Sequence, residues 1–140
     1  MEINGIAHIQ LSVRNVVKST TFYEPLLHFL GLKTLMQSDE FFYCIGARTG
    51  VAIGQIDPKH ADDAFDQRRI GLHHICFRAR AREDIDELHD FVLGLGATIV
   101  HGPQEDAFAP GYYSVLFEDP NGIRIEANFV PGKGHLAKKE

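Results

Sequence analysis

Cysteine is scarce in this chain, and tryptophan is absent. Two cysteines, Cys44 and Cys76, occur in 140 residues, which is too few for the disulfide framework of a small secreted domain. The opening residues also lack the basic and apolar segments of a secretion signal. We therefore expect a cytoplasmic protein in which both thiols are reduced.

Long apolar runs and clusters of basic residues are missing as well. No run approaches the roughly 20 apolar residues of a membrane span, so no membrane segment is expected. The formal net charge is −5 and the Lys and Arg residues are scattered, whereas a nucleic-acid footprint needs a clustered basic face. Nucleic acid is therefore not an expected partner. With 44% hydrophobic residues, the chain has the composition of a globular protein that forms one core without a structural metal.

An internal repeat dominates what the sequence does contain. GIAHIQLSV at 5–13 matches GLHHICFRA at 71–79, with Gly, His and Ile identical. LGLKTLM at 30–36 then matches LGATIVH at 95–101 at an offset one residue smaller. A repeat of this length is a whole structural module, so the chain consists of two copies of one unit.

Each half shows the same order of expected elements. Apolar residues alternate along 9–13 and 75–79, as in half-buried strands. Each strand leads into a helical pattern that stops at Gly31 or Gly96. Three more strand-like stretches follow each helix, and they are 33–37, 41–46 and 50–56 in the first half and 97–101, 112–118 and 122–129 in the second. The sequence therefore predicts an α+β protein with two βαβββ modules in tandem.

The first helix carries two boundary signals that disagree. Ser19 and Thr20 are typical of a helix start. Pro25 removes a backbone hydrogen bond inside the helical pattern, which predicts a kink or a later start.

The modules have clear outer limits. They occupy about 3–56 and 70–130, and a polar surface linker, 57–70, joins them. Residues 131–140 have the Pro, Gly and Lys content of a flexible tail, to which we assign no role.

Three polar residues point to a metal site. His8 and His74 are equivalent in the repeat, and each faces away from the helix side of its strand. If the modules pair about a pseudo-twofold axis, the two imidazoles lie on one shared surface. Glu126 faces the same way in the last strand. Two His and one carboxylate around a central cavity form a facial triad that suits one divalent ion, namely Fe, Mn, Ni or Zn.

The motifs FEDPNGIRIE at 117–126 and GLHHI at 71–75, together with the repeat, identify the chain as similar to the vicinal oxygen chelate superfamily. This group contains glyoxalases, bleomycin resistance proteins and extradiol dioxygenases, and the resemblance covers residues 3–130. It implies a single glyoxalase-like domain, 1–140, with a half-open, eight-stranded barrel-like sheet around a metal cavity. The ligands that it implies are His8, His74 and Glu126.

The fourth ligand of this family is missing from its expected place. Matching Gly50 to Gly122 puts Gly54 there, and glycine has no side chain to bind metal. A register slip of one residue would put Gln55 there instead, so Gln55 stays open as a fourth ligand. Isomerases of the glyoxalase I type use a carboxylate at this position to move a proton, so the resemblance disfavours lactoylglutathione lyase.

The three-ligand set resembles the extradiol dioxygenases and the fosfomycin-modifying thiol transferases. Both usually carry a Tyr ten residues before the last ligand, where this chain has Leu116. The extradiol pattern also has a His at about 107–109, where this chain has Ala, Phe and Ala. The choice among lyase, dioxygenase and transferase chemistry therefore stays open.

The residues expected around the metal define the predicted function. Substrate-binding candidates are Gln10, Arg78, Tyr112 and Arg124, with the two arginines placed to hold a carboxylate or phosphate. Glu126 is the catalytic candidate, in an enzyme whose metal acts as a Lewis acid on adjacent oxygens of a small substrate. The resemblance also implies a homodimer, because short two-module members often complete their cavity with a partner chain. The alternative is a metal-free protein of the bleomycin-resistance type that sequesters a ligand, although such relatives typically lack the His/His/Glu set.

Overall fold

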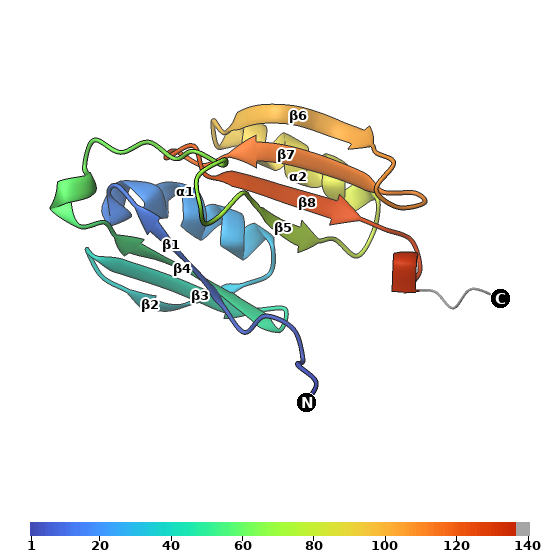
Figure 1. The fold of residues 1–140 in the computed structure, drawn as a ribbon, viewed down its shortest axis with the longest axis horizontal. Helices are drawn as coiled ribbons and strands as arrows, with labels where there is room; N and C mark the ends of the chain where they lie inside the picture. Colours follow the sequence, from blue (N-terminus) through green and yellow to red (C-terminus); the bar gives the residue numbers. More distant parts are fainter. Residues whose placement is uncertain (137–140) are drawn as a thin grey trace. The chain divides into compact units, whose positions relative to one another are not determined.

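The chain folds as two units of the same design. The computed structural model describes residues 1–136, so the last four residues of the expected tail lie outside the described residues. One compact unit is Met1–Ala64, and the other begins at Phe65. Each unit contains one α-helix and four strands in βαβββ order (Figure 1). The α+β class and the two tandem βαβββ modules are thereby confirmed.

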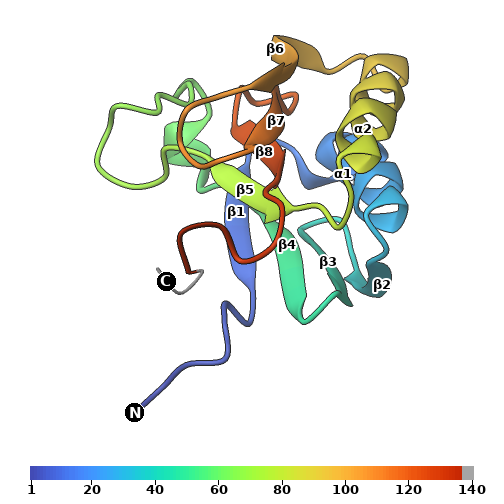
Figure 2. The same cartoon turned by 90° about the vertical axis from the view of Figure 1, so that its right-hand side faces the viewer.

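The first unit is a four-stranded sheet with a helix on one face. Its elements are β1 (Ile9–Val13), α1 (Val16–Phe29), β2 (Lys33–Gln37), β3 (Phe41–Gly46) and β4 (Thr49–Gln55). The strand order is β1-β4-β3-β2, with β1 and β4 parallel and the other pairs antiparallel. Helix α1 covers one face of this sheet (Figure 2). Strands β2 and β3 have the bounds that the sequence predicted, 33–37 and 41–46.

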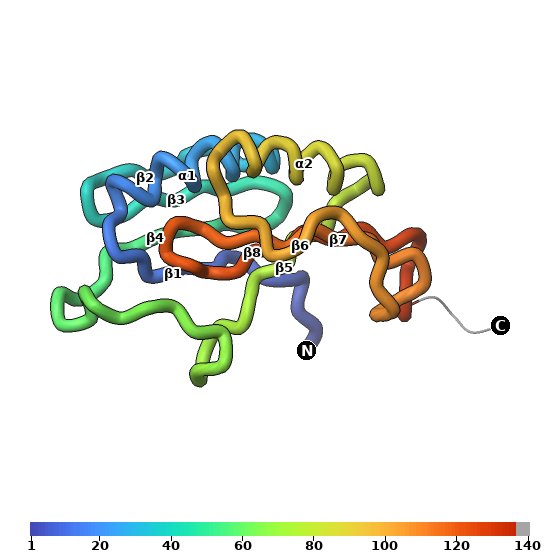
Figure 3. The backbone as a smooth tube through the Cα atoms, turned by 90° about the horizontal axis from the view of Figure 1, so that it is seen from above, coloured from blue at the N-terminus to red at the C-terminus, as the bar shows by residue number. Residues whose placement is uncertain are grey.

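The second unit repeats this arrangement. Its elements are β5 (Ile75–Arg78), α2 (Glu83–Gly94), β6 (Thr98–Glu105), β7 (Tyr113–Glu118) and β8 (Arg124–Phe129). The order is β5-β8-β7-β6, again with the first pair parallel, and α2 lies along one face (Figure 3). Strand β6 runs beyond the expected 97–101 because its pairing with β7 continues, through register shifts, as far as Glu105 opposite Tyr113. These bulges interrupt the alternation that sequence patterns rely on.

The start of α1 differs from both sequence signals. The helix begins at Val16, where the side chain of Asn15 accepts a hydrogen bond from the backbone N–H of Lys18 at 2.8 Å. This is the bond that defines an N-cap, and it overrides the later start expected from Pro25. Ser19 and the residue after it lie inside the helix and are buried, so they do not mark its beginning.

The strands of the second unit separate an apolar face from a polar one. Val115, Phe117 and Ile125 are at most 1% exposed and form the core on the side of α2. The residues between them in β7 and β8 point to the opposite face, among them Leu116 and Glu126, which are paired across the two strands. The polar face is the one that the sequence assigns to the site.

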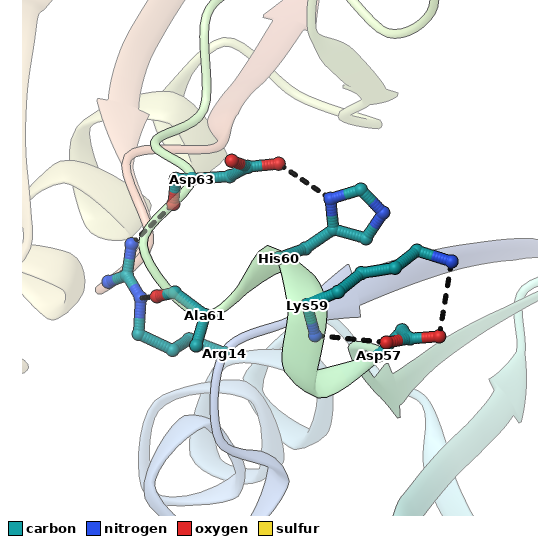
Figure 4. A network of polar contacts seen from close by, with 6 residues as sticks. All are labelled: Arg14, Asp57, Lys59, His60, Ala61 and Asp63. Atoms are coloured by element: carbon teal, nitrogen blue, oxygen red, sulfur yellow. Dashed lines mark hydrogen bonds and ion pairs between the residues drawn. The ribbon is translucent and has the colours of Figure 1, made fainter.

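The first part of the linker is tied to the first unit. Residues Pro58–His60 form a short 3-10 helix, whose first turn is capped by Asp57 through the backbone N–H of Lys59 (Figure 4). This bond, together with the Lys59 ammonium at 3.3 Å, holds the pKa of Asp57 below its usual value. The guanidinium of Arg14 donates to the carbonyl oxygens of Ala61 and Asp63 at 3.1 and 2.7 Å. These hydrogen bonds therefore hold the first residues of the linker, 57–63, against the first unit.

The segment after β8 also has local structure. A second 3-10 turn, Gly134–Leu136, lies within the expected tail. Among residues 1–136, no helix combines the length and the apolar character that crossing a membrane requires.

Candidate metal centre

His74 and Glu126 meet on the polar face of the second sheet. His74 directly precedes β5, and Glu126 lies in β8, which runs parallel to β5. The Nε2 atom of His74 is 3.2 Å from Oε2 of Glu126. The Glu126 side chain is only 13% exposed, whereas that of His74 is 37% exposed. Two of the three predicted ligands therefore converge at the edge between interior and solvent.

The other oxygen of this carboxylate is held by Tyr112. The Tyr112 hydroxyl donates a hydrogen bond to Oε1 of Glu126. Burial raises the pKa of Tyr112, and the bond to the carboxylate raises it further, so the phenol keeps its proton at neutral pH. Oε1 is thus occupied, and Oε2 is the oxygen directed toward His74.

His73 extends the same series of contacts. Its Nδ1 lies 2.8 Å from Nδ1 of His74, and the rings meet edge to face with centroids 5.0 Å apart. One of these nitrogens donates and the other accepts, because a neutral imidazole carries a single N–H. In either tautomer Nδ1 of His74 is engaged and Nε2 faces Glu126. The sequence assigned His73 no role, and its only signal was its place beside His74 in the motif GLHHI.

Cys76 lies opposite Glu126 in the register of β5 and β8. Although the residue is exposed, the surrounding protein removes water from its thiol. This desolvation, together with the negative charge of Glu126, raises the pKa of Cys76 to about 12. Such a thiol stays protonated at neutral pH, where it is a poor nucleophile. The atoms here that can donate electron pairs to a metal are therefore Nε2 of His74 and Oε2 of Glu126, and not the protonated thiol of Cys76.

His8 occupies the matching position in the first unit. It directly precedes β1, as His74 precedes β5. Its ring stands edge-on to the ring of Tyr43, at an interplanar angle of 74° and a centroid distance of 6.4 Å. The aromatic contact fixes one side of the imidazole.

The position that lacks the fourth ligand is filled by a neighbouring side chain. A Cβ atom on Gly54 would lie 3.1 Å from Nε2 of Gln10, so the Gln10 amide lies over this glycine. Gln55 uses both of its polar atoms on the backbone: Nε2 donates to the carbonyl of Arg14 at 2.7 Å, and Oε1 accepts from the N–H of Val16 at 3.1 Å. Gln55 therefore anchors the start of α1.

The two predicted substrate-binding arginines have different surroundings. Arg124 lies opposite Glu118 in the register, and its Nε is 3.4 Å from that carboxylate. Arg78 ends β5 opposite Asn128, and the structure shows it in no ion pair within residues 1–136. Of these two arginines, Arg78 is therefore the one without an ion-pair partner among the described residues.

The described residues bring together part of the predicted site. Across positions 1–136, no group of three or more His, Cys, Asp or Glu side chains is gathered that could hold a metal ion. The second unit supplies His74 and Glu126, with Tyr112 behind the carboxylate, while His8 and Gln10 belong to the first unit.

Comparisons with known proteins place this geometry in context. Residues 5–127 match the model of the Glyoxalase/Bleomycin resistance protein/Dioxygenase superfamily. The chain is 26% identical over 129 residues to the metallothiol transferase FosB of Shouchella clausii (strain KSM-K16). This alignment covers 90% of this chain and 80% of FosB. It is 25% identical over 120 residues to protein YqjT of Bacillus subtilis (strain 168), which covers 85% and 94% of the two chains.

The fold has close counterparts among solved structures. A candidate glyoxalase from Bacillus halodurans superimposes with a TM-score of 0.78 at 25% identity, covering 91% of this chain and 96% of that one. The agreement in fold extends over nearly the full length of both chains.

Proposed function

Because the chain belongs to the Glyoxalase/Bleomycin resistance protein/Dioxygenase superfamily, we propose that it is a divalent-metal-dependent enzyme acting on a small substrate. The observation that carries this proposal is the contact between His74 Nε2 and Glu126 Oε2 at 3.2 Å. A nitrogen and an oxygen donor at this distance can turn toward one cation, and we propose that His8 completes the His/His/carboxylate set typical of Fe, Mn, Ni and Zn sites.

The two converging donors fit such an ion in their chemistry. Tyr112 holds Oε1 of Glu126 and leaves Oε2 available, and in the tautomer in which Nδ1 of His74 donates to Nδ1 of His73, Nε2 of His74 carries the lone pair that a metal needs. Second contacts of this kind orient metal ligands and set their basicity. We therefore assign His8, His74 and Glu126 as ligands, with Glu126 also as the catalytic residue.

The chain's own groups limit the reaction that such a site performs. A bound divalent ion would supply Lewis-acid stabilisation of negative charge on adjacent substrate oxygens. The Gln10 amide lies over Gly54, so the first strand pair presents a neutral hydrogen-bonding group there instead of a carboxylate base. This arrangement favours addition or transfer chemistry over proton abstraction. The 26% identity to a metallothiol transferase supports the same direction.

Two further features belong to this proposal. We propose a cytoplasmic homodimer, on the strength of the family resemblance and the two free thiols. Arg78 and Tyr112 contact the substrate in this scheme, together with Gln10. Arg124, the fourth residue of this set, would have to leave its ion pair with Glu118 to bind the substrate.

The deciding experiment is elemental analysis of protein purified without added metal or chelator. We expect a near-stoichiometric divalent metal that is lost in each of the variants His8→Ala, His74→Ala and Glu126→Ala. His89→Ala is the matched control, because His89 lies on α2 beside Asp90 and should keep the metal. Circular dichroism would show that each variant is folded.

The possible results separate the two functional classes. Loss of metal in His74→Ala and Glu126→Ala but not in His8→Ala would retain the centre and remove His8 from it. Wild-type protein that contains no metal and takes up none on titration would eliminate the metalloenzyme and leave a ligand-sequestering protein.

A further inference from the structure

A small pocket opens at one end of the second sheet. It has a volume of about 170 Å³ and lies among the end of β5, the end of β8, the loop before β7 and the segment after β8. Figure 1 shows that β5 and β8 end on the side of this unit where the chain enters β7. At about 30 Å³ per water molecule, this volume is equivalent to about six waters, so it suits a small ligand or one end of a larger one.

The charges around this pocket have one sign. Arg78 and Lys133 both line it, and among residues 1–136 no Asp or Glu does. A second pocket of the same unit, with a volume of about 260 Å³, has charges of both signs. Arg124 and Glu118 line it and form an ion pair at 3.4 Å, and Asp66 and Arg68 line it as well. The smaller pocket is therefore the one with an unbalanced positive charge, and an anion would supply the missing partner.

The remaining walls are apolar and aromatic. The ring of Phe108 meets the ring of Tyr112 edge to face at a centroid distance of 5.3 Å, and both line the pocket. Val130 and Leu136 line it as well. A ligand that fits these walls has a short apolar or aromatic body next to its charged group.

The loop before β7 and the segment after β8, which both line the pocket, contact each other. His135 Nε2 donates to the carbonyl of Phe108 at 2.5 Å. Gly111, at φ +70°, lies so close to Pro131 that a Cβ atom would approach the proline ring to 2.8 Å. The loop before β7 and the segment after β8 therefore form one packed structure, which means that the pocket is built into the fold.

Tyr112 connects this pocket to the candidate metal centre. Its ring lines the pocket, and its hydroxyl binds Glu126. We infer that the pocket selects a small organic anion, with a carboxylate or phosphate group held by Arg78 and Lys133 and an apolar body against Phe108. This inference rests on the proposed function, because it names the substrate class of the same site.

The test is calorimetric titration with three probes of similar shape: benzoate, phenylphosphonate and the neutral benzamide. Each is titrated into metal-reconstituted protein and into chelator-treated protein. We expect at least one anion to bind about tenfold or more tightly than benzamide, because a hydrogen bond to a charged group strengthens binding by about this factor. The stronger of the two anions distinguishes a carboxylate from a phosphate-type substrate.

Variants assign the binding to this pocket. Arg78→Met and Lys133→Met should each weaken anion binding about tenfold while leaving benzamide unchanged. Lys18→Met removes the same charge from an exposed position on α1 of the other unit and should bind the probes as wild type does. Phe108→Ala should weaken all three probes alike.

The outcomes distinguish the pocket from the metal. Anion binding that depends on Arg78 and Lys133 in protein without any metal would support the pocket even if the metal proposal failed. Equal affinity for benzamide and the anions, no effect of Arg78→Met and Lys133→Met in folded protein, or no anion binding in either preparation would overturn the inference.

Discussion

Tyr112 donates its hydroxyl hydrogen bond to Oε1 of Glu126, while Oε2 of the same carboxylate lies 3.2 Å from His74. The two oxygens of one carboxylate therefore have different tasks. One fixes the side chain in place, and the other is presented together with an imidazole nitrogen. This division is what an oriented, single-oxygen metal ligand requires.

Tyr112→Phe should weaken metal binding without unfolding the protein. The substitution keeps the ring and removes only the hydroxyl that fixes Glu126. Loss of such an outer contact typically lowers metal affinity about 10- to 100-fold. Competition with a chromophoric chelator measures the change directly.

Tyr113→Phe is the matched control for this prediction. Tyr113 is the next residue, and its hydroxyl donates to Asp86 at 2.6 Å, away from the carboxylate of Glu126. The control should bind metal as wild type does. Equal losses in both variants would show that the effect comes from the strand rather than from the bond to Glu126.

Gln55→Ala should reduce stability and leave the metal content unchanged. The variant loses two hydrogen bonds to backbone groups at the start of α1, which costs about 1–3 kcal/mol. Urea denaturation measures the free energy of unfolding, with Gln37→Ala on the exposed strand β2 as the control. A variant of normal stability that loses its metal would instead make Gln55 the fourth ligand.

Gly94→Ala and Gly96→Ala should have opposite effects on stability. Gly94 is the last residue of α2, and a Cβ there meets nothing within 4 Å, so alanine should add about 0.5–1 kcal/mol. Gly96 has φ +76°, where alanine is strained by about 1–2 kcal/mol. Thermal unfolding of the two variants in parallel gives the sign of each effect. Destabilisation of both would mean that α2 ends earlier in solution.

Cys44 should react with a thiol reagent only when the protein unfolds. Its side chain is fully buried, and this burial raises its pKa, so the reactive thiolate is less populated than in an ordinary cysteine at the same pH. In a Cys76→Ser background Cys44 is observed alone. Colour development with an aromatic disulfide at mildly alkaline pH should begin only as urea unfolds the protein. Rapid reaction of the native variant would contradict this expectation.

The fold could be predicted in most of its parts because two strong patterns coincide. The repeat placed equivalent residues such as His8 and His74 directly before equivalent strands, and the alternation of apolar residues located β1 and β5. The start of α1 was missed because several residues near it can cap a helix. Only the hydrogen bond from Lys18 to Asn15 identifies the one that does.

For the candidate site, the sequence pattern indicated which face each residue occupies but not which residues contact each other. Strand parity placed Tyr112 and Glu126 on one side of the sheet, yet their hydrogen bond depends on how the loop before β7 turns. The neutralisation of Arg124 by Glu118 depends on the register of β7 and β8. The pocket that contains Lys133 depends on the packing of two loops, for which a periodic pattern carries no signal.

The close approach of Gln10 to Gly54 also bears on how this chain can change over evolution. A glutamate at position 54 would need the space in which the Gln10 amide now lies. Only the amide end of the flexible, exposed Gln10 side chain makes this contact, so a carboxylate from β4 would displace the amide rather than be excluded by it. A switch of reaction type by mutation would therefore begin at position 54, and position 10 would need to change only the conformation of its side chain.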